Sequence, residues 1–152
     1  MSLELVQNYF NKLGIANRIQ VFDVSSATVE LAAQALHCKP ERIAKTLSFL
    51  IKDEPILIVT AGDVKIDNSK YKQYFGVKAK MLSFDEVETI IGHQVGGVCP
   101  FAVKENVKIY LDVSLKRFET IFPACGSANS AIELTPEELE TYSNSHDWID
   151  VC

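Results

Sequence analysis

Long apolar runs are absent from this chain of 152 residues. No stretch approaches the roughly 18 apolar residues that a membrane-spanning helix needs. The N-terminal residues Met-Ser-Leu-Glu-Leu also lack the basic and then apolar order that is typical of a secretion signal. We therefore expect a cytoplasmic protein that does not associate with a membrane.

Closely spaced cysteine pairs are absent as well. The four cysteines lie far apart and form no C-x-x-C motif; they are Cys38, Cys99, Cys125 and Cys152. This spacing argues against a disulfide framework and against a structural zinc site. We expect free thiols and no bound metal.

The glycine motifs of several enzyme classes are missing too. The chain contains no G-x-G-x-x-G and no G-x-x-x-x-G-K-[ST], so neither a dinucleotide site nor a Walker-type phosphate site is supported. It also lacks the G-x-S-x-G of a serine-hydrolase elbow. We expect no cofactor and no serine nucleophile of that type.

An excess of positive charge is lacking, because 15 basic residues face 20 acidic ones and the net charge is −5. This balance argues against a protein that grips nucleic acid through a global positive field. Any contact with a polynucleotide would need a local patch, and an ordinary solvated lysine surface is the alternative interpretation. Two clusters qualify as patches: the first holds Lys39, Arg42 and Lys45, and the second holds Lys65, Lys70, Lys72, Lys78 and Lys80.

The composition is that of one soluble globular domain, with 47% hydrophobic and 23% charged residues. A chain of this length can bury roughly 68 to 70% of its unfolded surface, which is enough for a real core. No repeat and no Pro/Ser-rich linker interrupts it. We therefore expect a single domain over residues 1–152.

Short helices and short strands alternate irregularly along the chain, without a strict βαβ rhythm. This order predicts an α+β fold with a mixed sheet. Helical spacing and capping residues predict helices over 3–13, 29–36, 68–75 and 83–91 and from 135 onward, the second capped by Ser25 or Ser26. Alternating patterns predict strands over 18–22, 45–51 and 107–113. A hairpin turn after residue 51 predicts a partner strand over 56–60, and further short strands are predicted over 120–123 and 131–134.

Lys45 stands out because it begins a strand whose pattern is otherwise apolar. Period two places it on the same face as Leu47, Phe49 and Ile51, the face one would bury. An ammonium group there needs a polar partner. The alternative is that the flexible stem carries the charge out to water.

A glycine-rich run, Gly92-His-Gln-Val-Gly-Gly-Val-Cys-Pro-Phe101, offers free backbone N–H groups. Together with Lys45 it suggests a pocket for a polar ligand that carries a carbonyl. His93 and Cys99 within the run could instead form a thiol nucleophile if the loop folds the imidazole onto the sulfur. A buried cysteine that serves only as a small hydrophobe is the commoner case.

Two further residues have both a functional and a structural interpretation. Asp63 follows a predicted strand, where it could pair with a lysine or hold a ligand hydroxyl; it could also be an ordinary turn residue. Phe101 could form an aromatic wall of a pocket or pack in the core.

Three segments in this order resemble the YbaK family of free-standing aminoacyl-tRNA deacylases and the related editing domain of bacterial prolyl-tRNA synthetases. They are Pro40-Glu-Arg-Ile-Ala-Lys-Thr-Leu47, Gly92-x-x-x-Gly-Gly-x-x-Pro-Phe101, and Gly126-Ser-Ala-Asn-Ser-Ala-Ile-Glu-Leu134 followed by Thr-Pro-Glu-Glu-Leu139. The resemblance spans residues 26–142. It implies a compact mixed-sheet barrel with short helices around it.

The resemblance also implies hydrolysis of the ester that joins a wrong amino acid to the 3′ end of a tRNA. It assigns catalytic positions to Lys45, Gly96 and Gly97. It assigns substrate contacts to Thr46, Asp63, Gly92, Pro100, Phe101, Gly126, Ser127 and Asn129. Its partners would be mischarged tRNA and a prolyl-tRNA synthetase. The alanine-removing branch tends to carry Asn where this chain has Thr46, so a cysteinyl-tRNA substrate is favoured.

In such a reaction, backbone N–H groups of the glycine loop would stabilise the charge that develops on the carbonyl oxygen. Lys45 would position the substrate, or act as a base if burial lowered its pKa. The attacking group would be water or the thiol of a cysteinyl substrate. Two alternatives remain open: a module that binds aminoacyl-adenosine, tRNA or a protein without turnover, and a thiol hydrolase that uses Cys99.

Overall fold

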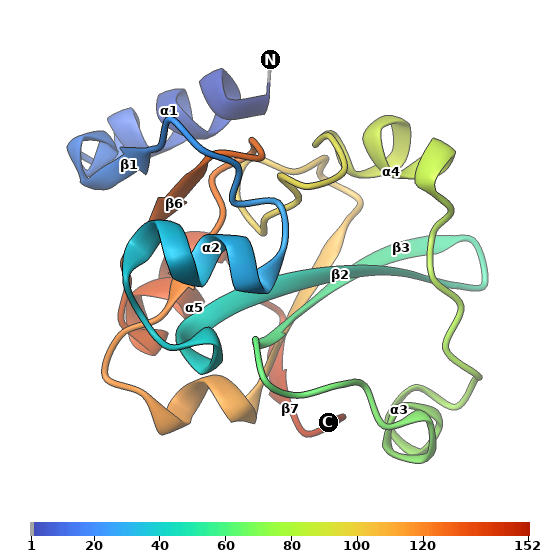
Figure 1. Ribbon diagram of the computed structural model, residues 1–152. Coiled ribbons are helices and arrows are strands. Elements are labelled where there is room, and N and C mark those ends of the chain that lie inside the picture. Colours follow the sequence, from blue (N-terminus) through green and yellow to red (C-terminus); the bar gives the residue numbers. More distant parts are fainter. Residues whose placement is uncertain (1) are drawn as a thin grey trace.

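The computed structural model describes residues 2–152 and shows short helices packed around a curved sheet (Figure 1). The α-helices in the described part are α1 (Ser2–Lys12), α2 (Val29–Leu36), α3 (Asn68–Phe75), α4 (Phe84–Ile91) and α5 (Pro136–Ser143). Single 3₁₀ turns lie at η1 (Ala16–Arg18), η2 (Pro40–Arg42) and η3 (Val113–Arg117).

Local capping chemistry accounts for most helix boundaries. α3 has the bounds that the sequence predicts and ends at Gly76, which adopts a φ of +77°. The expected capping box of Ser83 and Glu86 opens α4. The expectation for α2 was wrong: Thr28, not Ser25 or Ser26, caps this helix, because the Thr28 hydroxyl accepts from the Leu31 amide at 3.2 Å.

Seven strands form two sheets within residues 2–152. The larger sheet has the order β5-β2-β3-β4-β7, and β1 pairs with β6 in the smaller one. The strands are β1 (Ile19–Val21), β2 (Ile43–Ile51), β3 (Glu54–Ala61), β4 (Lys108–Asp112), β5 (Phe122–Pro123), β6 (Ser130–Ile132) and β7 (Asp147–Ile149). β2 and β3 are antiparallel, whereas the other pairs in the larger sheet are parallel.

Isolated bridges join the two sheets, since Ile121 pairs with Leu134 and Ala124 with Ala131. The result is a mixed sheet that curves into a half-barrel, which confirms the expected α+β class. The sequence patterns missed η1, η3 and β7. All three are short, and β7 contains only two apolar residues, Trp148 and Ile149, with polar residues on both sides of them.

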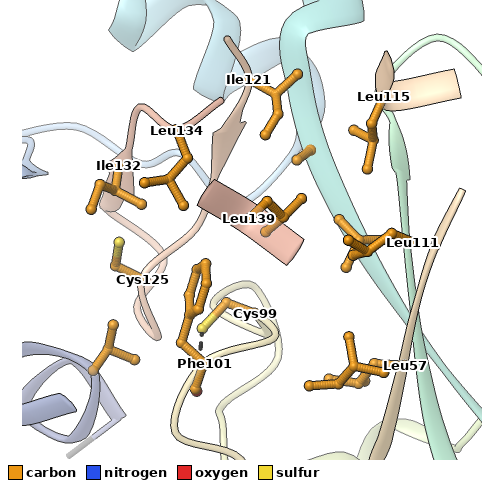
Figure 2. Packing of buried hydrophobic residues seen from close by; sticks show 14 of the residues in the cluster. Leu57, Cys99, Phe101, Leu111, Leu115, Ile121, Cys125, Ile132, Leu134 and Leu139 are labelled. Carbon is orange, nitrogen blue, oxygen red and sulfur yellow. Dashed lines mark hydrogen bonds between the residues drawn. The ribbon is translucent and has the colours of Figure 1, made fainter. Parts of the chain in front are cut away.

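The larger sheet carries a hydrophobic cluster on each face. The main core contains Val6 and Phe10 of α1 and Ile91 of α4, and Figure 2 shows part of it, with Phe101 beside Cys99 and with Leu57 and Leu111 of the sheet farther across the core. α1 and α4 lie on one side of the β2–β3 hairpin, and α3 lies on the other side near the C-terminus (Figure 1).

The second cluster includes Phe49 of β2 and Tyr71 of α3, with Leu47 and Ile51 packed against it. These β2 residues share a face with Lys45, as period two predicts. That face meets the smaller cluster, however, while Ala44 and Leu50 of the same strand point into the main core.

The outer edge of β2 is paired only at its two ends. Ile43 and Ala44 pair with β5. Further along, Phe49 pairs with Met81, and the Leu82 amide donates to the Ser48 carbonyl at 3.2 Å. Within the described chain, residues 45–47 have no strand partner on this side.

Candidate functional site

The unpaired part of β2 forms one wall of a cavity of about 510 Å³, a size typical of small-molecule sites. Its other walls come from residues 26–29 before and at the start of α2, residues 81–84 before and at the start of α4, the turn at residues 95–96, and residues 130–131 of β6. Most of these side chains are hydrophobic, so polar atoms at the cavity are few and specific.

Two such polar atoms are the Oγ of Ser26 and the Oγ1 of Thr46. Both hydroxyl oxygens are buried, and neither has a hydrogen-bond partner among the described residues. Both residues line the cavity. A buried polar group without a partner costs about 1–3 kcal/mol. The cavity is therefore suited to a ligand that brings polar atoms of its own.

The main chain of Thr46 adds further hydrogen-bonding groups. The Ser48 carbonyl and the Leu50 amide point to the outer side of β2, where they bond to Leu82 and Lys80. Because main-chain groups alternate between the two sides of a strand, the N–H and C=O of Thr46 point to the same outer side. That side is the cavity wall.

Lys45 also lines the cavity. Its Nζ donates a hydrogen bond to the main-chain carbonyl of Val64, in the loop after β3. The side chain is half-buried rather than directed into bulk water. An ammonium group has three donors, so this bond leaves donors for a ligand.

The glycine-rich run forms a tight turn at the cavity. The Gly97 amide donates to the Gln94 carbonyl at 3.0 Å. Gly96, the third residue of this turn, has a φ of +92°, which glycine adopts readily and which fits a type II turn. Gly96 lines the cavity, and its amide has no acceptor in residues 2–152. Lys45 and Gly96, which are far apart in the sequence, thus line the same cavity.

Gly97 serves a different purpose. A Cβ atom at this position would lie 2.5 Å from the Ser127 amide nitrogen, so the glycine permits backbone to pack on backbone. Its own N–H is engaged in the turn, and the residue does not line the cavity. Gly97 therefore places the turn, and Gly96 is the residue with a free donor.

Residues 126–129 precede the cavity residue Ser130 and support the wall of the cavity. The Ser127 hydroxyl donates to Asn129 Oδ1 at 2.8 Å, and the Asn129 side-chain amide donates to the Phe22 carbonyl at 3.1 Å. The Ser26 amide donates to the Ala128 carbonyl at 2.6 Å. These bonds hold Ser26 in position. Gly126, Ser127 and Asn129 do not line the cavity themselves.

The remaining expected substrate contacts lie outside the cavity lining as well. Gly92 ends α4 with a φ of +103°. Pro100 and Phe101 are buried, and the Phe101 ring packs on Phe10 at a centroid distance of 4.7 Å. Asp63 forms a two-point ion pair with Arg117, at 2.6 and 3.1 Å, and the Arg117 hydrogen bonds lower the pKa of this carboxyl. Each of these residues has a structural partner.

His93 and Cys99 do meet, with Sγ 3.6 Å from Nε2 (the position of Cys99 is shown in Figure 2). Both residues are fully buried in the main core. Burial raises the pKa of the Cys99 thiol to about 12 and lowers the pKa of His93. A protonated thiol that does not line the cavity is a poor nucleophile. This geometry argues against the Cys99 hydrolase.

Several cavity residues were not foreseen from the sequence. The clearest are Ser26, Ser48, Met81, Phe84 and Ser130. The hydroxyl-rich stretch Ser25-Ser-Ala-Thr28 is the one local signal that could have pointed to Ser26. The others reach the site through long-range packing.

No group of three or more His, Cys, Asp and Glu residues in the described part of the chain is arranged to hold a metal ion. Among residues 2–152, no helix is long and apolar enough to cross a membrane.

Comparisons with known proteins agree with this fold. YwhH of Bacillus subtilis (strain 168), an uncharacterized protein, is 56% identical over all of this chain and 98% of its own length. EbsC of Enterococcus faecalis, which is named as a candidate Cys-tRNA(Pro)/Cys-tRNA(Cys) deacylase, is 29% identical over 77% of this chain and 73% of its length. The proline–tRNA ligase of Aquifex aeolicus is 31% identical over 58% of this chain, which matches only 16% of that enzyme.

A crystal structure described as a candidate trans-editing enzyme for prolyl-tRNA synthetase superposes with a TM-score of 0.88. It is 24% identical and covers 99% of this chain and 96% of its own, which shows a shared fold. Residues 23–142 match the family described as the aminoacyl-tRNA editing domain. This match spans all of the cavity walls, and the chain belongs to the YbaK-like family of aminoacyl-tRNA editing domains.

Proposed function

We propose that this protein is a free-standing hydrolase that removes a small, wrongly attached amino acid from the 3′ end of a tRNA, with Cys-tRNA(Pro) as the favoured substrate. The observation that carries the proposal is the convergence of Lys45, the free Gly96 amide and two unpartnered hydroxyls on one cavity. These groups come from segments far apart in the sequence. The similarity to EbsC supports the choice of a cysteinyl substrate.

The geometry suits hydrolysis of an ester. Negative charge develops on the carbonyl oxygen when a nucleophile adds to the ester carbon, and a preorganised N–H donor stabilises that charge. Gly96 supplies such a donor without a side chain in the way. Removal of one comparable donor in other enzymes slows catalysis by about 10² to 10³.

Lys45 is assigned a positioning role. It donates to the Val64 carbonyl, and its remaining donors would bind the ribose or carbonyl oxygens of an aminoacyl end. The attacking group is water or, for a cysteinyl ester, the sulfur of the substrate. No side chain of the cavity is needed as a nucleophile, in keeping with the burial of Cys99.

The cavity selects the amino acid by size and polarity. One methylene group changes binding by only about 1–3 kcal/mol in a hydrophobic pocket, so size alone gives modest discrimination. The hydroxyls of Ser26 and Thr46 favour an amino acid with a polar group that can form hydrogen bonds with them. The similarity to proline–tRNA ligases supports a partnership with prolyl-tRNA synthetase, which would supply tRNA affinity to an acidic protein.

The test is deacylation of Cys-tRNA(Pro) and Ala-tRNA(Pro) by the purified protein. The wild type should shorten the lifetime of the cysteinyl ester more than that of the alanyl ester. Lys45→Ala should reduce the rate at least tenfold, and Lys45→Arg should restore only part of it because the planar guanidinium places its donors differently. Equal rates for the wild type and Lys45→Ala would remove the lysine from the mechanism.

Binding without turnover is the competing outcome. The unpartnered hydroxyls of Ser26 and Thr46 would serve a ligand that is held and not cleaved just as well. If the wild type binds aminoacyl-tRNA but leaves every ester in the panel intact, the protein is a binding module and the hydrolase proposal fails.

A further inference from the structure

Large hydrophobic side chains are exposed at the mouth of the cavity. Phe84 is 75% exposed, Met81 is 56% exposed and Val95 is 43% exposed, and all three line the cavity. Phe84 is the first residue of α4, so its ring is carried on a helix that a capping box holds in place. An exposed aromatic ring at the mouth of a cavity, on a backbone that is held in place, can pack against a flat apolar surface.

The chain that leads to Phe84 is extended and fixed. Residues 78–82 run beside the outer edge of β2: the Leu50 amide donates to the Lys80 carbonyl at 2.9 Å, and Phe49 pairs with Met81. In Figure 1 this connection passes from α3 to α4 across the β2–β3 hairpin. This backbone pairing therefore fixes the positions along β2 at which residues 78–82 present their side chains to a ligand.

Two exposed lysines precede the apolar mouth on this segment. Lys78 and Lys80 are two residues apart, which corresponds to about 6.6 Å in extended chain. That separation is comparable to the distance between neighbouring phosphates of a single nucleic-acid strand. No salt bridge in residues 2–152 involves either lysine.

The charge of the segment that precedes the cavity mouth also suits a nucleic-acid strand. Residues 65–80 contain five lysines and one aspartate, a net +4, in a chain whose net charge is −5. Lys70 is already paired with Asp150 at 3.2 Å, and among the other four lysines of this segment Lys78 and Lys80 lie closest in sequence to the cavity residues Met81 and Phe84. Asp85 and Glu86 follow Phe84, so an anion is disfavoured at the ring itself and a neutral base is favoured there.

We propose that residues 78–84 form a track for the single-stranded 3′ end of an RNA. The ring of Phe84, with Met81 beside it, stacks a nucleobase at the cavity mouth, while Lys80 and Lys78 contact the phosphates that precede this base. The track rests on the proposed function, because it delivers the aminoacyl end to the cavity. It adds a recognition element that contacts the nucleic acid and not the amino acid.

The test measures binding, so that it does not depend on hydrolysis. The probe is a fluorescently labelled RNA microhelix with a single-stranded 3′ end and a free terminal hydroxyl. Stacking of one base on an aromatic ring contributes enough that Phe84→Ala should raise Kd about tenfold, or about 1.4 kcal/mol. Phe84→Trp should keep near wild-type affinity, whereas Phe84→Leu, which retains apolar area but no ring, should resemble Phe84→Ala.

The lysines are tested through the salt dependence of the same Kd. For two lost phosphate contacts on a single strand, the slope of log Kd against log salt should fall by about 1.4 in the double variant Lys78→Gln/Lys80→Gln. The matched control is Lys12→Gln/Lys108→Gln, which makes the same charge change at exposed positions outside the segment and should leave the slope unchanged.

Three outcomes would overturn the track. The first is a Kd for Phe84→Ala within twofold of the wild type, and the second is that Phe84→Ala weakens binding of a blunt microhelix, which lacks the single-stranded 3′ end, as much as it weakens binding of the probe. The third is an equal salt-dependence slope for the two double variants. A loss of co-elution with prolyl-tRNA synthetase in Phe84→Ala, with RNA binding unchanged, would identify a protein interface and refute the proposal. Binding that depends on Phe84 in a protein that hydrolyses no ester would retain the track and remove the proposed hydrolase.

Discussion

Replacement of Thr46 by valine should make the protein more stable and less active. The Thr46 hydroxyl is buried at the cavity wall and has no hydrogen-bond partner in the described residues. Valine has nearly the same shape and suits a β-strand, so Thr46→Val exchanges an unpartnered hydroxyl for a methyl group. In the absence of ligand, the substitution removes a desolvation penalty and creates no cavity.

The penalty of a buried polar group without a partner is about 1–3 kcal/mol. We take about 1 kcal/mol as the expected gain in the free energy of unfolding, since Thr46 as a residue is only half-buried. For a domain of this size, that gain raises Tm by about 2–4 °C. The same substitution should lower kcat/KM for deacylation about tenfold, because the bound substrate loses its partner.

Thr60 provides a matched control on the neighbouring strand. It is fully buried, and its hydroxyl donates to the Ala61 carbonyl at 3.1 Å. Thr60→Val should therefore lower Tm by about 2–4 °C, the opposite sign for the same chemical change.

Thermal unfolding of both variants without ligand tests the predicted Tm changes, and deacylation assays test the predicted loss of kcat/KM. A fall in Tm for Thr46→Val would mean that its hydroxyl is satisfied in the free protein. An unchanged kcat/KM would mean that it does not meet the substrate. Either result refutes the reasoning.

Three further predictions concern residues around the site. Gly97→Ala should cost about 1–3 kcal/mol in urea unfolding, because its Cβ would lie 2.5 Å from the Ser127 amide nitrogen; wild-type stability would show that the two loops yield freely. Cys99→Ser should retain deacylation activity, and wild-type activity should resist alkylating reagents, since the thiol is buried with a pKa of about 12; inactivation by both would revive the thiol mechanism. The Arg18 hydrogen bond lowers the pKa of Glu138 from 4.5 to about 2, so its contribution to stability is complete above about pH 4.5 and is lost as pH falls toward 2. Arg18→Gln should flatten Tm across that pH range, and an unaltered profile would contradict the assignment.

The elements that the sequence predicted well are those set by local chemistry. The capping box of Ser83 and Glu86 and the stop at Gly76 involve residues close in sequence, and the structure confirms them. The β2–β3 hairpin is equally local: the sequence predicted strands over 45–51 and 56–60, and in the structure β3 begins at Glu54, so a two-residue turn joins the strands. Thr28 was missed as a cap because several hydroxyl residues in a row offer equivalent candidates, and tertiary packing chooses among them.

The candidate site was predictable only in part. Lys45 and Gly96 carried signals of their own: a charge in an apolar strand and a glycine in a turn. Phe84 carried none, and Ser26 carried only the weak signal of a hydroxyl-rich stretch, because the roles of both depend on which segments lie beside the outer edge of β2. Pairing between segments that lie far apart in the sequence cannot be predicted from local periodicity. The same limit explains why Phe101 and Asp63 proved to have core and ion-pair partners.

The missing stretch of partner strand beside residues 45–47 has a consequence for how this protein can change. The groups exposed by that interruption, the N–H and C=O of Thr46, belong to the peptide backbone, and among substitutions only proline, which lacks the N–H, would remove one of them. The side chains around the cavity can therefore change, and with them the ligand that the cavity prefers, while the backbone groups that can bond to a carbonyl or an amine remain.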